Sequence, residues 1–407
     1  MKRSLLLSLS FWVWLGFISF PMIHAYRDEN ADGAMLHYQL AGWLQFAGMA
    51  LLLYPGGFLK VWRRLNPAQL AIIAVFYLSV LLQIQGEGFD IAVGLIYTLV
   101  FVGTALLLPT IWNIPSDDIA KALAGAAVVL TCFQILSIAL LGLPQERFVG
   151  AINPNLFGTT VLPAFILAQF GTGWLMIVVR IVSVIVAALI SSRYCLFGAL
   201  IAFFLFQLTF NRIRVGTIAL ILASACVMIF VSYKFPEILA LSDAERGFDS
   251  GFTGRDQEWA SALDFITNNP WGAGYKRSDI TFAGHNGYLK LIVEFGVLGG
   301  VILIAAFLWI VGQAAYTAHS LSCSDPQIRR FASARAAGLV AFSAAAFFQP
   351  QLFNIGDPVG ISIMLLLFGP NFAGQPVAST FYRVRPGAAG YEARQTIRSA
   401  PSGRRSS

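Results

Sequence analysis

The chain has 407 residues and a formal net charge of +7, and 57% of its residues are hydrophobic whereas only 12% are charged. An ordinary soluble domain carries about 25% charged residues, so this composition excludes a soluble globular protein and indicates a polytopic membrane protein. The net charge does not indicate nucleic-acid binding, because the basic tail 373–407 is typical of a disordered cytoplasmic end beside anionic lipid.

Apolar runs recur along the chain, and a transmembrane helix needs about 20 such residues. They predict an all-α membrane domain over residues 1–372 with about twelve transmembrane helices. The first run follows Lys2 and Arg3, and we interpret it as an uncleaved anchor, with a cleaved signal peptide as the alternative. The expected spans are 5–23, 40–59, 68–85, 91–111, 122–143, 156–171, 173–191, 194–210, 215–234, 296–316, 332–352 and 358–372.

The loops between these spans carry a charge bias that orients the chain. Alternating sides from a cytoplasmic N-terminus gives basic inside loops, such as 60–69, 211–216 and 317–335, and mostly neutral or acidic outside loops. Both termini are therefore expected in the cytoplasm. Arg180 lies in the cytoplasmic half of its span and His319 in a cytoplasmic loop, so we interpret Arg180 as a cation that snorkels to the interface and assign neither residue a role.

Four basic groups fall on the outer side at or near the ends of spans. They are Arg147, Arg193, Arg255 and His285. A lone arginine in such a place is more often a plain interfacial cation. Four on one face of a chain so poor in charge favour an anionic ligand, because guanidinium matches phosphate oxygens bidentately.

The outer segment 235–284 is the longest loop, too polar to span the membrane and too short to form a core of its own. Within it, "TGRDQEWASALDFITNNP" predicts a helix with Thr253 as N-cap and "NNP" as its end. Trp259, Leu263 and Ile266 recur at helical spacing and predict its apolar face. Arg255 lies four residues before Trp259 and is expected to point inward with that face.

A second helix is expected from His285, where "HNGYLKLIVEFGVLGGVILI" joins a polar head to an apolar run. Asn286, Lys290 and Glu294 stand at i, i+4 and i+8 and make a polar stripe with one Lys–Glu pair. His285 heads this helix at the outer interface, and an imidazole can accept a proton near neutral pH.

These motifs together resemble the signature of the O-antigen ligase and polymerase superfamily. "TGRDQEW", "NPWGAG", "HNGYL" and "EFGVLGG" follow its order, while "RFVGAINPNLFG" and "SSRYCLFG" resemble its upstream motifs. The resemblance covers residues 147–305. The sequence departs from the family pattern in the tyrosine of "SSRYC" and in an outer loop that is short for a ligase.

The resemblance implies an integral-membrane glycosyltransferase of the C-type fold that acts on undecaprenyl-diphosphate-linked glycans at the periplasmic face of the bacterial inner membrane. By motif, Arg193 and Arg255 would hold the diphosphate and His285 would act as the base or orient the acceptor hydroxyl. Arg147 is a further candidate cation.

The same resemblance assigns Asn286, Tyr288 and Glu294 to shaping the site. Attack at the anomeric carbon opposite the leaving diphosphate would invert its configuration. Because the sequence shows no carboxylate pair of the glycosidase kind and no metal-ligand cluster, we expect a metal-independent transferase without a cofactor. The expected partners are the lipid-linked donor, an acceptor glycan, membrane lipid and export or chain-length proteins.

The acceptor stays open at this point. A polymerase would use another lipid-linked repeat unit of exopolysaccharide or O-antigen, which the short outer loop favours, and a ligase would use lipid A core. A transporter or flippase of lipid-linked glycan is the alternative from another class, although alternating access favours repeated halves and a midplane site. A third interpretation makes the outer loop a structural cap whose arginines only snorkel.

Overall fold

The structure is a computed structural model. All residues that it describes belong to one compact unit, Met1–Asn371. The described residues are 65–83, 88–109, 116–144, 148–150, 152, 154–210, 255–275, 285–321, 325–354 and 357–369.

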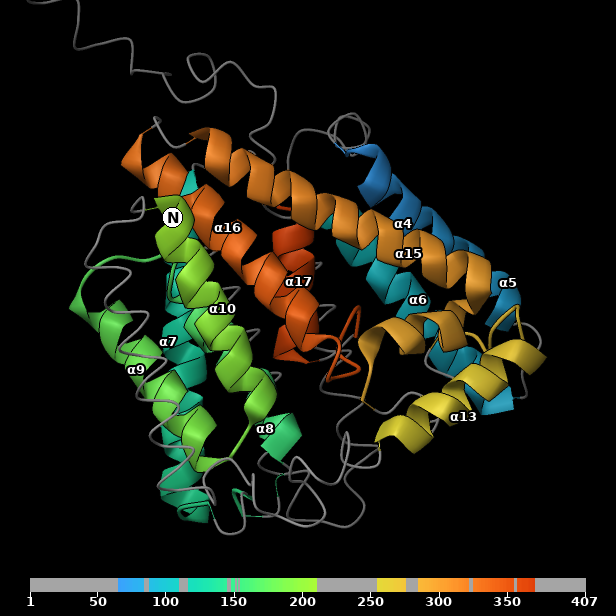
Figure 1. Cartoon of the computed structure of the whole chain (residues 1–407), viewed down its shortest axis with the longest axis horizontal. Coiled ribbons are helices and arrows are strands. Elements are labelled where there is room, and N and C mark those ends of the chain that lie inside the picture. The colour runs from blue at the N-terminus through green and yellow to red at the C-terminus, as the bar shows by residue number, and fades with distance from the viewer. Residues whose placement is uncertain are drawn as a thin grey trace, which may run out of the picture. The chain divides into compact units, whose positions relative to one another are not determined.

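The described part of the chain is helical throughout, apart from an isolated antiparallel bridge between Val149 and Ile152. Figure 1 shows its helices, coloured along the chain. They are α4 (Pro67–Leu78), α5 (Val80–Gln83), α6 (Gly88–Leu107), α7 (Ser116–Leu141), α8 (Pro154–Leu167), α9 (Trp174–Leu189), α10 (Arg193–Phe210), α13 (Arg255–Asn268), α15 (Gly287–Ser320), α16 (Pro326–Ala345) and α17 (Pro358–Leu367).

Three of the described helices, α7, α10 and α15, are long and apolar enough to cross a membrane, and several shorter helices are strongly apolar. The expected all-α membrane architecture is confirmed at this level. The expected spans 5–23, 40–59 and 215–234, the N-cap Thr253 and the tail 373–407 lie outside the described residues.

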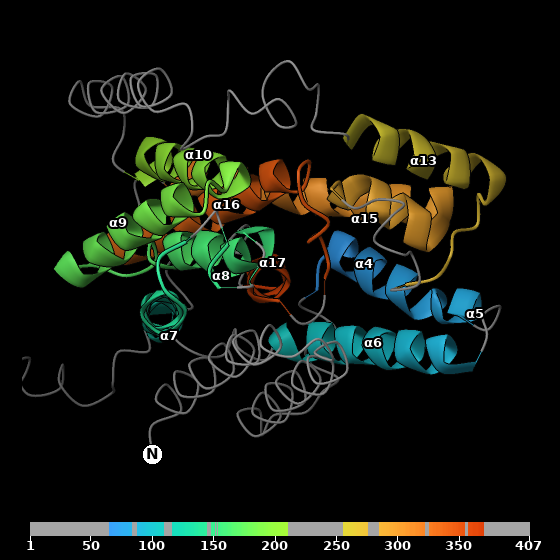
Figure 2. The ribbon, with the colours of Figure 1, turned by 90° about the horizontal axis from the view of Figure 1, so that it is seen from below.

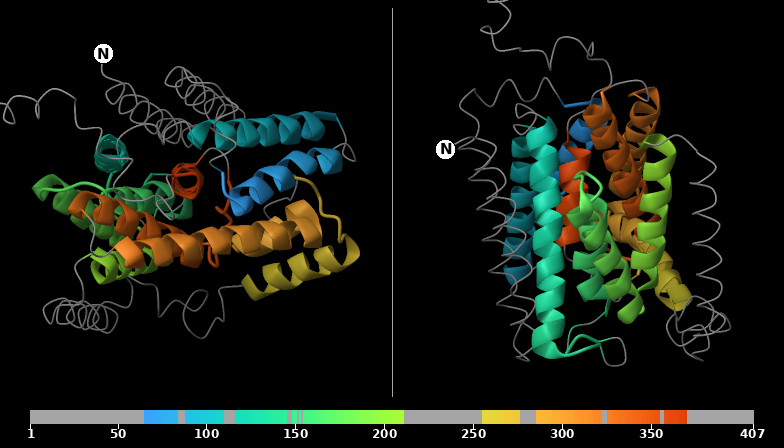
Figure 3. Two further views of the ribbon diagram at one scale, coloured as in Figure 1. Left: turned by 90° about the horizontal axis from the view of Figure 1, so that it is seen from above. Right: turned by 90° about the vertical axis from the view of Figure 1, so that its left-hand side faces the viewer.

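The helices pack as two neighbouring groups that meet where α15 contacts α16. In one group α4 lies between α6 and α15, and α13 lies along α15 (Figure 2). In the other, α7, α9 and α10 surround α8 and stand beside one another in the right-hand view of Figure 3. The helix α16 packs along α10 and so closes the second group.

The second group has α8 and α17 as its interior. Nearly every residue of these two helices is buried, which is what a helix that is apolar on all sides requires. The carbonyl groups at the end of α17 are capped from α16, because Arg335 Nε donates to Leu366 O at 2.7 Å. By contrast, α9 exposes a row of large aliphatic side chains, as a helix facing lipid does.

The long helix α15 is broken at Gly296, whose φ of 71° and ψ of 173° are non-helical. The break releases backbone groups that α-helical bonds would otherwise satisfy. The turn 270–274, "PWGAG", meets them with its own backbone: Ala273 N donates to Val293 O (2.8 Å), and Gly274 N donates to Glu294 O (2.9 Å). In return, Val297 N donates to Pro270 O at 2.9 Å.

We call this backbone contact between the turn 270–274 and the break at Gly296 the glycine lock. It needs a glycine on both sides. A Cβ on Gly272 would lie 2.3 Å from Gly296 N, and a Cβ on Gly296 would lie 2.5 Å from the carbonyl carbon of Trp271. The two backbones therefore approach more closely than any side chain allows. "WGAG" is a turn, as its composition predicts, and it also completes α15.

The helix boundaries around α16 differ from the expected spans. The inside loop 317–335 is mostly helical, since α15 continues to Ser320 and α16 begins at Pro326. The expected span 332–352 ends early at Ala345. The physical reason lies in "QPQLF": the residue before Pro350 is disfavoured in the α conformation, and Phe353 has a positive φ of 55°.

The glycine lock generates a stability prediction. Gly296→Ala should strongly destabilise the protein, because this φ/ψ region is essentially restricted to glycine, at a cost of about 1–3 kcal/mol, and the added Cβ meets backbone atoms. Gly312→Ala in the same helix is the matched control. Its Cβ has nothing within 4 Å, and it should be neutral or stabilising by about 0.5–1 kcal/mol. Thermal unfolding of both variants in detergent tests this, and equal melting temperatures would contradict the lock.

Candidate functional site

Several helix ends converge on the connection between α16 and α17, residues 346–357, which we call the α16–α17 loop; residues 355 and 356 of it lie outside the described part. The loop follows the C-terminal end of α16 and ends at Asp357, the N-cap of α17. The N-terminal residues of α15 and the aromatic residue Tyr275 bond to this loop or to the adjacent end of α16. The loop is therefore the common support of the candidate site.

His285 stands directly before the N-cap of α15 and is half-buried. The cap is Asn286, whose Oδ1 accepts from Tyr288 N at 2.9 Å and Leu289 N at 3.1 Å. Gly287 N donates to Ala346 O at 2.7 Å. The turn that carries His285 is thus fixed from both sides, by its own cap and by the α16–α17 loop.

The contacts of Gly287 and Tyr288 explain why these residues stand at two further positions of the "HNGYL" motif. A Cβ on Gly287 would lie 3.0 Å from Gln349 O, so helix and loop approach closely at this glycine and a larger residue would crowd the loop. The Tyr288 hydroxyl lies 2.9 Å from Ser343 O and 2.8 Å from Ser343 Oγ, and its ring lies 4.7 Å from that of Phe347. These contacts fit the shaping role expected for Asn286 and Tyr288.

The helix α13 begins at Arg255 and packs on α15 through Ala262, which forms a small core with Val293. Phe265 and Ile266 pack against that core, whereas Leu263 is 55% exposed. The predicted apolar face was therefore wrong at Leu263. The face of α13 that packs on α15 is centred on Ala262. Alanine is only weakly hydrophobic, so the sequence pattern did not indicate this face.

The inward direction expected for Arg255 agrees with the structure. The residue is half-buried, and its guanidinium carbon lies 5.9 Å from the centre of the Phe348 ring, within the range of a cation–π contact. Phe348 belongs to the α16–α17 loop. Arg255 and the turn that carries His285 therefore contact the same short segment.

Arg193 is the first residue of α10 and is half-buried. Its neighbour Tyr194 is buried, donates to Asn155 O at 2.8 Å and also interacts with the side chain of Gln351 in the α16–α17 loop. Arg193 is therefore linked to the α16–α17 loop through its neighbour Tyr194, whereas Arg255 contacts the loop directly. Arg147 lies outside the described residues.

Tyr194 is the residue at which "SSRYC" departs from the family pattern, and the structure shows how it is accommodated. A Cβ on Gly158 would lie 2.4 Å from the Tyr194 hydroxyl oxygen. Gly158 ends the "NPNLFG" stretch, and Asn155, which accepts from Tyr194, belongs to it. The two upstream motifs thus pack directly against each other.

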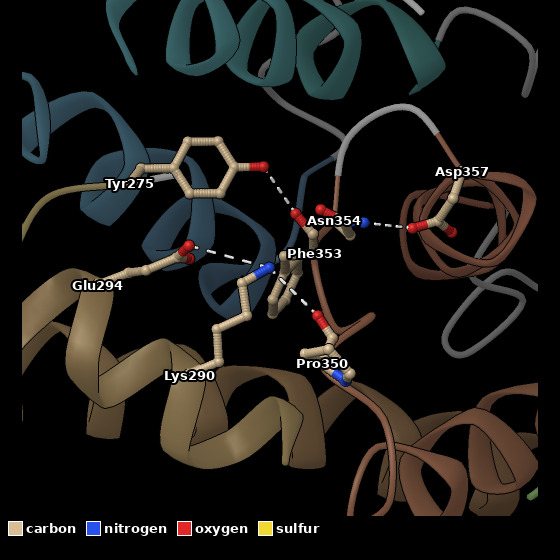
Figure 4. A network of polar contacts seen from close by, with 7 residues as sticks. All are labelled: Tyr275, Lys290, Glu294, Pro350, Phe353, Asn354 and Asp357. Carbon is tan, nitrogen blue, oxygen red and sulfur yellow. Dashed lines mark hydrogen bonds and ion pairs between the residues drawn. The ribbon is translucent and has the colours of Figure 1, made fainter. Parts of the chain in front are cut away.

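Glu294 is 1% exposed and lies inside the protein rather than on its surface. Lys290 Nζ lies 3.9 Å from Glu294 Oε1 and donates to Pro350 O at 3.1 Å. Figure 4 shows this lysine between the carboxylate and the loop. The expected i, i+4 pair is confirmed, and its lysine also holds the α16–α17 loop to α15.

The same network continues along the loop (Figure 4). The hydroxyl of Tyr275, which is fully buried, donates to Phe353 O at 2.8 Å, and Asn354 donates to the carboxylate of Asp357. Asp357 also caps α17 by accepting from Gly360 N at 2.7 Å. Ionic, aromatic and capping interactions together fix the loop.

Sequence reasoning missed the loop as the organising element, together with Tyr275, Asn354 and Asp357. The signal for Asp357 was present, because an acidic residue directly before Pro358 is a typical helix start. Tyr275 gave no signal of its own. Within the described ranges, no three His, Cys, Asp or Glu side chains are grouped to hold a metal ion.

In a comparison with known families, residues 172–304 match the family model described as O-Antigen ligase. The resemblance to the O-antigen ligase and polymerase superfamily is confirmed over this region. It contains Arg193, Arg255 and the "HNGYL" and "EFGVLGG" motifs, whereas Arg147 and "NPNLFG" precede it. No curated protein matches the chain.

The buried ion pair generates a prediction about stability. Lys290→Met should cost about 3–5 kcal/mol, because it leaves the buried carboxylate of Glu294 without this cation. The double variant Lys290→Met/Glu294→Leu should recover much of that loss. Lys121→Met is the control, since the exposed pair with Asp117 should contribute about 0–1 kcal/mol. Melting temperatures test the order, and a double variant no more stable than the single one would contradict it.

Proposed function

We propose that this chain, whose residues 172–304 match the O-antigen ligase family, is a membrane glycosyltransferase that transfers a glycan from undecaprenyl diphosphate to an acceptor hydroxyl. The family match supports the reaction type. The observation that carries the residue assignment is the shared contact of Arg255 and of the His285 turn with the α16–α17 loop.

In the proposed reaction, the oxygen of the acceptor hydroxyl attacks the anomeric carbon of the donor sugar. The bond from that carbon to the diphosphate oxygen breaks, and the electron pair leaves on undecaprenyl diphosphate. Attack opposite the leaving group inverts the configuration. The donor is already activated, so no metal or cofactor is needed to make the leaving group depart.

The roles follow from the charge that changes during this step. Arg255 and Arg193 stabilise the negative charge that develops on the diphosphate, as preorganised cations do, and Arg147 is a further candidate. His285 takes the proton of the acceptor hydroxyl or orients that hydroxyl. Asn286, Tyr288 and Glu294 shape the site, because they fix the turn and the loop that support these groups.

The proposal includes a C-type fold with about twelve transmembrane helices, placed in the bacterial inner membrane. The site would face the periplasm and both termini the cytoplasm, as the charge bias of the loops indicates. This placement is supported by the way the helix ends meet: the N-terminal ends of α10, α15 and α17 lie beside the α16–α17 loop, which follows the C-terminal end of α16. Reporter fusions at residues 250 and 285 test this orientation.

Within this chemistry we propose a polymerase of exopolysaccharide or O-antigen repeat units, because the outer segment 235–284 is short for a ligase. Its acceptor would be a second lipid-linked repeat. Export or chain-length proteins would then be functional partners. The ligase, which passes the glycan to lipid A core, is the alternative with the same chemistry.

One observation favours a transporter of lipid-linked glycan as the second candidate. The helix α15 is broken, and interrupted helices bind solutes in many transporters. In such transporters, however, the freed backbone groups point at the solute. Here Val293 O, Glu294 O and Val297 N are bonded to the turn 270–274, so the break is filled by the protein itself.

The site assignment is tested with purified protein, undecaprenyl-diphosphate oligosaccharide and candidate acceptors. His285→Ala should lower kcat by about 10²–10⁴-fold with little change in donor KM, since general-base contributions are of this size. Arg255→Ala should lower kcat/KM by at least about 10²-fold, as removal of an oxyanion-stabilising donor does.

Matched controls are His319→Ala, at the other end of α15, and Arg329→Ala, whose guanidinium also lies over a phenylalanine ring, at 5.0 Å from Phe210. Both should retain near wild-type turnover. Full transfer by His285→Ala and Arg255→Ala would overturn the assignment. Movement of lipid-linked glycan across vesicles without a new glycosidic bond would favour the transporter.

The acceptor and the stereochemistry are tested in the same system. We expect a lipid-linked repeat unit to accept glycan and lipid A core not to, and NMR of the new linkage to show the anomeric configuration opposite to that in the donor. Transfer to lipid A core alone would make the protein a ligase. Retention of configuration would rule out a single direct displacement.

A further inference from the structure

A groove lies at the other end of the helix bundle from the candidate site. It has a volume of about 440 Å³ and is bounded by the first turns of α7, α9 and α16 and by the turn that follows α8. On α16, most of the helix length separates Arg330 in this groove from Ser343 beside the site, about 20 Å at the usual helical rise. The groove is therefore distinct from the site.

The groove has an apolar trough and a basic rim. Its trough is lined by small and aliphatic residues, among them Gly125, Val128, Leu175 and Met176. At its rim, Asp117 and Lys121 form an ion pair that cancels their charges. The rim cation that this pair does not cancel is Arg330.

A second arginine lies close to Arg330. Arg180, one turn after the groove residue Met176, donates from Nε to Met176 O at 3.0 Å and is near enough to Arg330 for the two charges to repel. Arg330 itself donates to Gln169 O at 3.3 Å and to Gly171 O. Arg330 lines the groove and also lies over the rings of Phe206 (5.6 Å) and Phe210 (4.9 Å), whereas Arg180 adjoins the groove through Met176. Among the described residues neither guanidinium forms an ion pair with a carboxylate.

This combination suits one class of ligand. Two neighbouring guanidiniums repel each other unless an anion lies between them, and phosphate accepts from guanidinium in a fixed bidentate geometry. An apolar trough between membrane helices accepts a hydrocarbon chain, which contributes about 0.8 kcal/mol per buried CH₂. A free phosphate would use the arginines but not the trough.

We propose that this groove binds an anionic phospholipid of the leaflet opposite the candidate site, with the phosphate held by Arg180 and Arg330 and an acyl chain along Gly125, Val128 and Leu175. The site is independent of the proposed transferase reaction. It gives Arg180 a role beyond snorkelling.

The test uses the full chain in neutral detergent and native mass spectrometry with phosphatidylglycerol or phosphatidylcholine of identical chains. Wild type should retain phosphatidylglycerol about tenfold better, and Arg180→Gln should abolish that preference, because charge-assisted bonds to phosphate are lost. Arg180→Lys should keep most of it. Glycerol 3-phosphate, which has no acyl chain, should not displace the lipid at equal concentration.

Two further variants separate the groove from a general basic surface. Arg329→Gln is the matched control, because Arg329 neighbours Arg330 and also lies over Phe210 but does not line the groove; it should bind like wild type. Gly125→Phe fills the trough without changing charge and should lower retention about fivefold or more. Size-exclusion profiles and melting temperatures identify variants that do not fold.

The outcomes decide the proposal. Unchanged retention by folded Arg180→Gln, equal loss in Arg329→Gln, or displacement by glycerol 3-phosphate would each overturn it. If folded Gly125→Phe kept full retention, the trough would not be the binding site. Since the readout is lipid retention and not glycan transfer, these results are separate from those that test the transferase.

Discussion

The break in α15 sets the constraint on which the site depends. Backbone N–H and C=O groups away from water must be satisfied inside the protein, and a broken helix exposes several of them at once. The turn 270–274 satisfies them with backbone groups alone. These bonds tie the turn that follows α13 to a fixed point on α15. Because α13 is one continuous helix, they also fix how far Arg255 lies in space from the break.

The break also allows a polar half-helix to exist beside an apolar one. Residues 287–295 carry Lys290 and Glu294, both buried, whereas the helix beyond Gly296 is apolar almost throughout. A buried ion pair contributes little net stability by itself. Its lysine, however, donates to Pro350 O, so the pair also holds the α16–α17 loop against α15.

Much of the helical framework could be predicted from the sequence because it depends on local patterns. Apolar runs located most described helices, and the i, i+4 spacing predicted the Lys290–Glu294 pair. The exposure of Leu263 was missed, since it depends on packing against a helix distant in the chain. The end of α16 was missed although Pro350 gives a local signal for it. The α16–α17 loop was also missed: its residues Gln349, Pro350 and Gln351 carry no charge, and its importance arises only from what bonds to it.

Charge is arranged differently at the two ends of the helix bundle, and this difference carries functional meaning. At the site end, the buried charges of Lys290 and Glu294 compensate each other, and the carboxylate of Asp357 caps the start of α17. These groups hold the α16–α17 loop in place. At the groove end, Arg180 and Arg330 donate to backbone carbonyls, and Arg330 also lies over the rings of Phe206 and Phe210. The proposed phosphate would reduce the repulsion between these two like charges. The sequence alone could not distinguish an arginine that snorkels to the interface from one that binds a phosphate, because both have the same hydropathy.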